Sequence, residues 1–325
     1  MRHSIYVSRA IPQPGLDLLA MVFDVEVNPH NRPCARQELL AGVQNKDALL
    51  CLLTDVIDAE VMDAAPHLNV IANYAVGYNN IDLDAATERS IMVANTPGVL
   101  TDTTADLAFA LLMACARRIV EADQFMRKGN YRGWSPMLLL GSDVHHKTLG
   151  LVGFGRIGQA MAERTSGFRM KVLYHDQTRL PERIEKQYHA EYRQLPDLLR
   201  ESDFVSLHVP LADSTLHLIG SEQLSLMKPT AILINTSRGP VVDEKALVAA
   251  LENSQIGGAG LDVYESEPDF QPELAQMSNV VMLPHVASAS VETRTKMAVM
   301  AAENACAAVR GEMPPNIVNP SAGPS

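Results

Sequence analysis

The stretch GLVGFGRIGQAMAER, from Gly150 to Arg164, places three glycines between an apolar run and a segment with helical spacing. The glycines follow the pattern Gly153-x-Gly155-x-x-Gly158, and the next predicted strand ends at Asp176. This context is typical of a dinucleotide-binding turn. Gly153 would allow the tight turn, Gly155 would let the backbone approach a pyrophosphate, and Gly158 would let the helix pack on the sheet. The alternative is a tight strand-to-helix turn that binds nothing.

Asp176 bears on which dinucleotide is bound. A carboxylate at this strand end can accept hydrogen bonds from both hydroxyls of an adenosine ribose and would repel a 2′-phosphate, which favours NAD. Arg179, three residues later, carries a guanidinium that could neutralise the extra phosphate of NADP. We therefore predict NAD as the cofactor and keep NADP as the alternative.

Short apolar runs alternate with helix-like segments along most of the chain, which predicts parallel α/β units. A second series of runs opens at Thr148, so we expect two sheets, the second with about six strands. The expected strands of the first series lie in residues 5–7, 48–53, 70–76 and 91–96.

Two long helical patterns stand outside this alternation. One follows Pro97-Gly98, with Asp102 or Thr103 as the expected N-cap, and the other runs from Ser290 to Gly311. If both connect the two sheets, the second domain is inserted into the first. The predicted domains are a substrate (catalytic) domain of residues 1–99 and 290–325 and a nucleotide-binding domain of residues 100–289.

Composition excludes several classes of protein. The 325 residues carry a formal net charge of −11, which makes nucleic acid a poor partner. The longest apolar run, Leu107 to Ala116, is too short to span a bilayer, so we expect no membrane segment. The cysteines have no paired or metal-type spacing and are expected to be reduced thiols of a cytoplasmic protein: Cys34, Cys51, Cys115 and Cys306.

His145-His146 is the one pair that suggests a metal site. Adjacent residues of an extended segment point to opposite faces, and no cysteine or carboxylate cluster accompanies the pair. We therefore predict no metal.

Chemistry is expected at the carboxyl ends of the strands, where α/β sheets bind ligands. A hydride-transfer enzyme that reduces a 2-keto acid needs a cation for the carboxylate and carbonyl, a proton donor, and a group that keeps the donor protonated. Arg238, His285 and Glu267 provide these three. Taken singly, each has a structural explanation as a surface charge, a hydrogen-bonded histidine or a turn cap. The polar residues at predicted strand ends are Asp176, His208, Arg238, Asp262, Glu267 and His285.

Five motifs closely resemble those of the D-isomer-specific 2-hydroxyacid dehydrogenases, in that family's order and spacing: GFGRIG, HVPL, NTSRGPVVDEKAL, GAGLDVYESEP and LPHVASAS. The resemblance extends from NYAVGYNNIDLDAA to PNIVNP. It implies that Arg238, Glu267 and His285 are the catalytic set, and that the backbone of Val76 and Gly77 binds the substrate carboxylate.

The same resemblance implies a fold, an assembly and a set of cofactor contacts. The fold is a Rossmann nucleotide-binding domain inserted into a flavodoxin-like substrate domain, both with doubly wound parallel sheets. The assembly is a homodimer in which the arm Asp102–Gly129 forms the contact. The implied cofactor-binding residues are Gly153, Gly155, Arg156, Ile157, Gly158, Asp176, Val209, Pro210, Thr215, Thr236, Ser237, Arg238, Asp262 and His285.

Within the family, NTPGVLTDTTADLAFALL looks most like glyoxylate/hydroxypyruvate reductases, and DVHHKTLG looks like bacterial relatives that also reduce 2-ketogluconate. Two positions depart from the pattern. Leu138 stands where glyoxylate reductases usually carry an aromatic residue, which would widen a substrate pocket reached from the dimer partner. Ala287 stands where many relatives have glycine.

The predicted function is NAD(P)H-dependent reduction of small 2-keto acids to D-2-hydroxy acids, with His285 as general acid and Arg238 as substrate anchor. One alternative is a non-catalytic, NADH-sensing protein similar to the family's transcriptional corepressor. The other is a formate- or phosphite-type dehydrogenase of the same fold. Phosphite-oxidising relatives carry a lysine where this chain has Val76, which counts against the latter.

Overall fold

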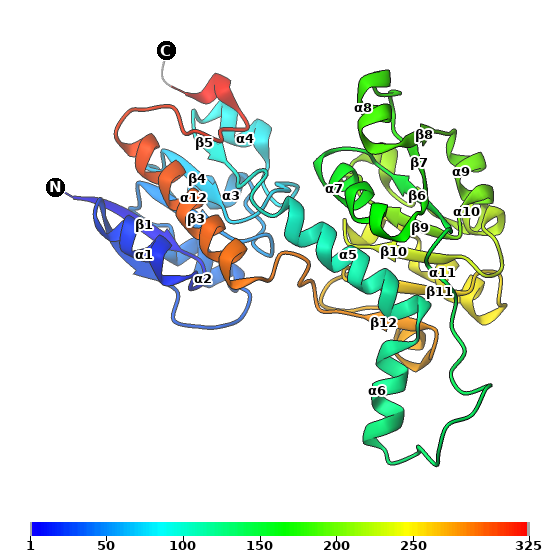
Figure 1. Cartoon of the computed structure of the whole chain (residues 1–325). Coiled ribbons are helices and arrows are strands. Elements are labelled where there is room, and N and C mark those ends of the chain that lie inside the picture. The colour runs from blue at the N-terminus through cyan, green and yellow to red at the C-terminus, as the bar shows by residue number, and fades with distance from the viewer. Residues whose placement is uncertain (1, 324–325) are drawn as a thin grey trace. The chain divides into compact units, whose positions relative to one another are not determined.

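The computed structural model describes residues 2–323, and their contacts divide the chain into two compact units. The split domain comprises the residues up to Leu100 together with those from Ala289 onward, and the inserted domain comprises Thr101–Ser288. Both contain a purely parallel sheet with helices on its faces (Figure 1). The predicted fold class of two parallel α/β domains is confirmed.

The split domain has a five-stranded sheet in the order β2-β1-β3-β4-β5. This order is that of flavodoxin-like folds, in which the chain reverses direction across the sheet between β1 and β3. The strands are β1 (His3–Val7), β2 (Phe23–Val27), β3 (Ala48–Cys51), β4 (Val70–Asn73) and β5 (Met92–Ala94). The helices are α1 (Gln13–Ala20), α2 (Arg36–Gly42), α3 (Ala59–Asp63), α4 (Leu83–Glu88) and α12 (Val291–Val309).

Helix α12 returns from the C-terminal part of the chain to complete the core of the split domain. It lies beside α1 (Figure 1), and the two helices approach so closely at Gly15 that a Cβ there would lie 2.7 Å from the Cβ of Ala298. Ser290 caps the helix by accepting a hydrogen bond from the N–H of Thr293, 3.1 Å away. The apolar face of α12 therefore joins segments that are far apart in sequence.

The inserted domain has a seven-stranded sheet in the order β12-β11-β10-β9-β6-β7-β8. The order reverses between β6 and β9, and such a switch point is where doubly wound sheets bind dinucleotides. The strands are β6 (Thr148–Val152), β7 (Lys171–His175), β8 (Ala190–Tyr192), β9 (Phe204–Leu207), β10 (Ile232–Asn235), β11 (Gly258–Leu261) and β12 (Val280–Met282).

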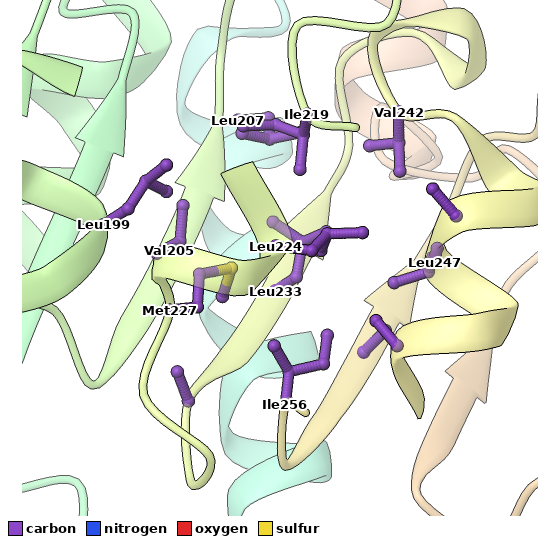
Figure 2. Close-up of a cluster of buried hydrophobic side chains, with 14 of the residues drawn as sticks. Leu199, Val205, Leu207, Ile219, Leu224, Met227, Leu233, Val242, Leu247 and Ile256 are labelled. Carbon is purple, nitrogen blue, oxygen red and sulfur yellow. The ribbon is translucent and has the colours of Figure 1, made fainter. Parts of the chain in front are cut away.

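Helices pack on this sheet through side chains from strands and helices alike. Figure 2 shows Val205 of β9 and Leu233 of β10 in one cluster with Leu224 of α10 and Leu247 of α11, all fully buried. The helices are α5 (Thr101–Ala116), α6 (Ile119–Arg127), α7 (Arg156–Arg164), α8 (Glu182–Tyr188), α9 (Leu195–Glu201), α10 (Ser221–Leu226) and α11 (Glu244–Glu252). Short 3-10 turns lie at Ser166–Phe168, Asp213–Thr215, Gly239–Val241, Pro272–Gln276 and Pro320–Ala322.

Two details differ from the sequence-based expectation. The helix expected after Gly98 begins at Thr101, and it breaks at Arg118, whose φ of +52° is left-handed, so that α5 and α6 are separate helices. Strands β2 and β8 were not predicted, and the second sheet has seven strands rather than about six. Both are edge strands whose exposed positions carry polar residues, and they therefore lack the continuous apolar run of an inner strand.

Candidate active site

Three neighbouring strands of the inserted domain, β10, β11 and β12, end at the same edge of the sheet. The segment after β10 carries Arg238, the segment after β11 carries Glu267, and the turn after β12 carries His285. Parallel strands bring the residues that follow them to one edge, so three positions spread over nearly fifty residues of sequence come together.

Glu267 and His285 form a hydrogen-bonded pair. Oε2 of Glu267 lies 2.8 Å from Nδ1 of His285, and both side chains are partly exposed, at 30% and 25%. The other carboxylate oxygen of Glu267 accepts the N–H of Tyr264, 3.1 Å away. Burial alone would raise the pKa of Glu267, but the hydrogen bond and charge of His285 hold it below its ordinary value. Glu267 is therefore ionised at neutral pH and orients the imidazole, leaving Nε2 for another partner.

Arg238 is partly buried beside this pair. Its Nη1 donates to the carbonyl of Ser237 over 2.8 Å, and the side chain of Asn235 ties the turn together by donating to the carbonyl of Arg238 and accepting from the N–H of Ser237. Burial lowers the pKa of Arg238, against the attraction of the Glu267 carboxylate. A guanidinium remains charged at any pH of interest, so the site keeps one fixed cation.

Asp262 fixes the turn that presents His285. Its carboxylate is fully buried and accepts the backbone N–H groups of Val286 and Ala287, each over 2.8 Å, while its carbonyl accepts the N–H of His285. Burial raises the pKa of Asp262, and the two N–H donors oppose that shift. His285 itself has a left-handed φ of +54°, which this turn imposes. Asp262, predicted as a cofactor contact, thus holds the backbone that carries His285, the predicted proton donor.

His208, the other histidine at a strand end, is unsuited to donate a proton. Burial lowers the pKa of His208 to about 4, and its Nε2 lies 2.9 Å from the hydroxyl of Ser206. The ring is neutral at physiological pH. Of the two candidates, only His285 has a carboxylate partner.

The glycine turn between β6 and α7 fits a dinucleotide. Gly153 has a φ of +91°, which favours glycine, and a Cβ on Gly158 would lie 2.3 Å from the carbonyl oxygen of Gly153. Gly158 therefore packs closely against the backbone that directly follows β6. A Cβ on Gly155 would meet nothing within 4 Å. Among the described residues, the backbone N–H groups of Arg156 and Ile157 have no acceptor. The N-terminal end of α7 therefore offers unpaired donors beside the open space at Gly155, an arrangement that suits a phosphate group.

The residues around Asp176, which are predicted to meet the adenosine ribose, are arranged in a way that favours NAD. The carboxylate of Asp176 accepts the N–H of Phe154 over 2.9 Å and that of Gln177 over 2.8 Å, which leaves lone pairs for further hydroxyl donors. Arg179 is held in a two-point pair with Glu185, at 2.8 and 2.9 Å. The hydrogen bond from Arg179 lowers the pKa of Glu185 to about 2, so the guanidinium has a permanent ionic partner within the domain.

The remaining predicted cofactor residues follow β9 and β10. The hydroxyl of Thr215 donates to the carbonyl of Pro210 over 2.7 Å and accepts the N–H of Ala212, so it shapes the turn after Val209. The hydroxyl of Thr236 is buried and has no hydrogen-bond partner among the described residues, next to Ser237 and Arg238.

In the split domain, the predicted carboxylate-binding backbone lies in the loop after β4. The carbonyl of Val76 accepts the side-chain N–H of Asn95 over 2.7 Å, and that of Gly77 accepts Asn73 over 2.9 Å. The N–H groups of Val76 and Gly77 donate to no acceptor among the described residues. Two donors are thus held in fixed positions with no internal partner. Sequence reasoning missed both asparagines, although each lies at or just after a strand end.

The predicted dimer arm consists of two parts that differ in burial. Helix α5 contributes Ala108, Leu111 and other residues to the domain core, whereas α6 has no buried residue. Large exposed apolar side chains are concentrated in α6 and the segment after it: Ile119, Val120, Met126, Tyr131, Trp134, Met137, Leu138 and Leu140. We call residues 119–140 the apolar arm; it begins with α6, which extends from the end of α5 (Figure 1).

No helix within residues 2–323 is long and apolar enough to cross a membrane. In the same range, no group of three or more histidine, cysteine or acidic side chains is arranged to hold a metal ion. His145 and His146 meet edge to face, with ring centroids 5.4 Å apart. The four cysteines are free thiols.

Comparison with known proteins agrees with this geometry. Residues 109–287, more than half of the chain, match the family model described as D-isomer specific 2-hydroxyacid dehydrogenase, NAD binding domain. A glyoxylate reductase from Korarchaeum cryptofilum is 55% identical over 98% of this chain and 96% of its own length. One from Thermococcus litoralis is 52% identical over 98% of this chain and 97% of its own.

Solved structures are similar over nearly the whole chain. A protein from Thermus thermophilus superposes with a TM-score of 0.91 at 46% identity, covering 98% of this chain and 100% of its own. An NADPH-dependent glyoxylate/hydroxypyruvate reductase from Sinorhizobium meliloti, solved with NADP and malonate, has a TM-score of 0.88 at 33% identity, covering 100% and 99%. The chain belongs to the D-isomer specific 2-hydroxyacid dehydrogenases, oxidoreductases that use a nicotinamide dinucleotide, and it carries that family's NAD binding domain.

Proposed function

We propose that the protein reduces glyoxylate and hydroxypyruvate to D-2-hydroxy acids with NADH. The observation that carries this proposal is the identity of 55% and 52% to relatives named glyoxylate reductase, over almost their whole length. The intact set of Arg238, Glu267 and His285 supports catalysis and counts against an NADH-sensing protein without turnover. The relatives also do not favour a formate- or phosphite-type dehydrogenase.

The residues of the inserted domain would donate one proton to the substrate and stabilise the negative charge that develops on its carbonyl oxygen. The bound nicotinamide would supply the hydride for the keto carbon. His285, protonated and oriented by Glu267 through Nδ1, would donate the proton on Nε2 to the carbonyl oxygen. Arg238 would hold a carboxylate oxygen and polarise the carbonyl, with paired donors that a lysine lacks.

The substrate carboxylate would be bound by backbone N–H groups. We assign it to Val76 and Gly77, because neither N–H group has an acceptor within residues 2–323, while Asn95 and Asn73 hold their carbonyls. Charge-assisted hydrogen bonds to backbone N–H groups bind a carboxylate without a second cation.

We propose a homodimer formed through the apolar arm. Trp134 is 83% and Met137 74% exposed, a degree of apolar exposure that is typical of an interaction surface. Leu138, on the same arm, would widen the partner's pocket and admit longer acids such as 2-ketogluconate. Free cysteines and a nicotinamide cofactor suit a cytoplasmic location.

A panel of 2-keto acids assayed with NADH and NADPH tests the function. We expect glyoxylate and hydroxypyruvate to be reduced, with NADH preferred over NADPH. We also expect 2-ketogluconate to be reduced, because Leu138 would widen the partner's pocket. Tight NADH binding without turnover of any 2-keto acid would refute the proposal in favour of a sensor. Light scattering of Trp134→Ser against the parent tests the dimer, because a monomeric parent would rule out the arm contact.

A further inference from the structure

The segment that carries Glu267 is held at its base by one buried carboxylate, that of Glu244. Glu244 lies in the first turn of α11 and is only 3% exposed. Its Oε1 accepts the N–H of Glu265 over 2.6 Å, and its Oε2 accepts the N–H of Gln271 over 3.1 Å. These two donors lie on either side of Glu267 along the chain.

Residues 265–271 form a narrow closed turn with Glu267 near its tip. Ser266 and Asp269 pair as an antiparallel bridge, and the N–H of Asp269 donates to the carbonyl of Ser266 over 2.9 Å. Glu244 therefore ties the start of the turn to its end, below the bridge. We call the arrangement of Glu244 with the N–H groups of Glu265 and Gln271 the loop clip.

Neighbouring groups couple the loop clip to the rest of the site. The N–H of Glu244 donates to Oε2 of Glu265 over 3.2 Å, and Oε1 of Glu265 lies 2.8 Å from Nε2 of His217. A Cβ on Gly239, next to Arg238, would lie 1.7 Å from the carbonyl oxygen of Tyr264. The turn thus packs without a gap against the backbone that follows Arg238.

Helix capping does not explain Glu244. The N-cap of α11 is Asp243, whose carboxylate accepts the N–H of Ala246 over 3.0 Å. The carboxylate of Glu244 is directed to the loop instead, where both of its oxygens are used. A buried carboxylate with two backbone donors is costly to lose, because each of the two part-buried N–H groups would lose its acceptor.

We propose that Glu244 is a positioning residue for the proton-donating pair, resting on the proposed function above. By closing the turn from both ends, it fixes Glu267 at the distance that orients His285. The other charged groups that face Glu267 are Arg238 and Asp262, which interact with it electrostatically. Glu244 touches neither substrate nor cofactor, and it acts only through Glu267.

Glu244→Gln is the test variant, because it keeps the size but turns an amide NH₂ toward one of the two backbone donors. We expect kcat for hydroxypyruvate to fall by about 10- to 100-fold, as for other small misplacements of reacting groups. The alkaline limb of the pH profile should move to lower pH, while the Kd of NADH stays unchanged. Glu252→Gln, on the exposed end of the same helix, is the matched control and should behave as the parent.

A double-mutant cycle separates positioning from general damage. In a Glu267→Gln background, Glu244→Gln should lower kcat by no more than about twofold, because residues that act as one unit are not additive. Losses that multiply in full would overturn the proposal, as would a parent-like pH profile in Glu244→Gln. If that variant does not fold, Gln271→Pro removes one donor at a residue whose φ of −64° suits proline, and the same outcomes apply.

Hydrogen exchange gives a readout that does not depend on turnover. The amides of residues 264–271 should exchange faster in Glu244→Gln than in the parent or Glu252→Gln, and equal exchange would refute the loop clip itself. A parent that reduces no 2-keto acid would refute the proposed function and the catalytic role of Glu244, whereas the exchange result would still decide whether the clip holds the turn.

Discussion

Replacing Glu267 with glutamine tests the core of the proposed mechanism. The variant keeps an acceptor for Nδ1–H of His285 when its amide NH₂ is turned toward the N–H of Tyr264, and it removes the negative charge. A hydrogen bond to a charged group contributes about 1.5–3 kcal/mol and a neutral one about 0.5–1.5 kcal/mol, so the change is worth about 1–1.5 kcal/mol. The pair is only partly exposed, at 30% and 25%, so solvent does not cancel this difference.

The loss should appear as a pH effect with a definite sign. The pKa of Glu267 is held below its ordinary value, so the carboxylate is charged throughout the working range and lies 2.8 Å from Nδ1 of His285. Reduction would use the proton of His285 and would therefore decline as pH rises. Without the charge, the alkaline limb should move down by about one pH unit, since one unit corresponds to about 1.4 kcal/mol.

Initial rates of hydroxypyruvate reduction across the neutral and alkaline range provide the assay, with NADH affinity measured separately. On the alkaline limb, well above the parent's apparent pKa, kcat should fall roughly tenfold, because a downward move of one pH unit leaves about a tenth of the protonated donor at a given pH. D-glycerate oxidation needs the neutral imidazole, so its acidic limb should move in the same direction and activity should persist to lower pH. Glu273→Gln, exposed in the following 3-10 turn, is the control. An unmoved alkaline limb in Glu267→Gln would remove Glu267 from the mechanism.

Three further predictions concern the anchor, the cofactor and the buried carboxylate behind the site. Arg238→Ala should cost about 3–6 kcal/mol of transition-state binding in kcat/KM, the value of two charge-assisted hydrogen bonds, and Arg238→Lys should cost less. NADH affinity should be nearly unchanged in both variants, and full activity of the alanine variant with glyoxylate would disprove the assignment. NADH should be preferred over NADPH by roughly tenfold in kcat/KM, because Asp176 would repel the 2′-phosphate of NADPH, and Glu185→Gln should reduce that preference by releasing Arg179. The free energy of unfolding of Glu185→Gln should also change less than that of the parent as pH falls from 4.5 toward 2. In that window the parent loses stability, because the pKa of Glu185 is lowered in the folded state. Asp262→Asn should destabilise the fold by about 1–3 kcal/mol in denaturant titrations and lower kcat; an effect confined to the Kd of NADH would mean that Asp262 serves only the cofactor.

Local patterns in the sequence were enough to predict the parallel α/β architecture and the dinucleotide turn. Inner parallel strands are buried on both faces and must be apolar runs, and the turn requires glycine where φ is positive or another backbone atom lies too close for a side chain. Edge strands β2 and β8 carry a weaker signal, because polar residues at their exposed positions interrupt the apolar run. Similarly, the break at Arg118 depends on one left-handed residue that no local motif marks.

Tertiary structure alone decided which polar side chains serve the candidate site. Glu244 begins a helix behind its N-cap Asp243, but nothing in the neighbouring residues directs its carboxylate to N–H groups more than twenty positions away. The same holds for Asp262 beneath the His285 turn and for Asn95 behind Val76. Each of these contacts joins segments that follow different strands, and only the lateral order of the strands brings them within hydrogen-bonding distance. That order results from burying the apolar faces of whole helices and strands, which is a property of the folded domain and not of any single stretch of sequence.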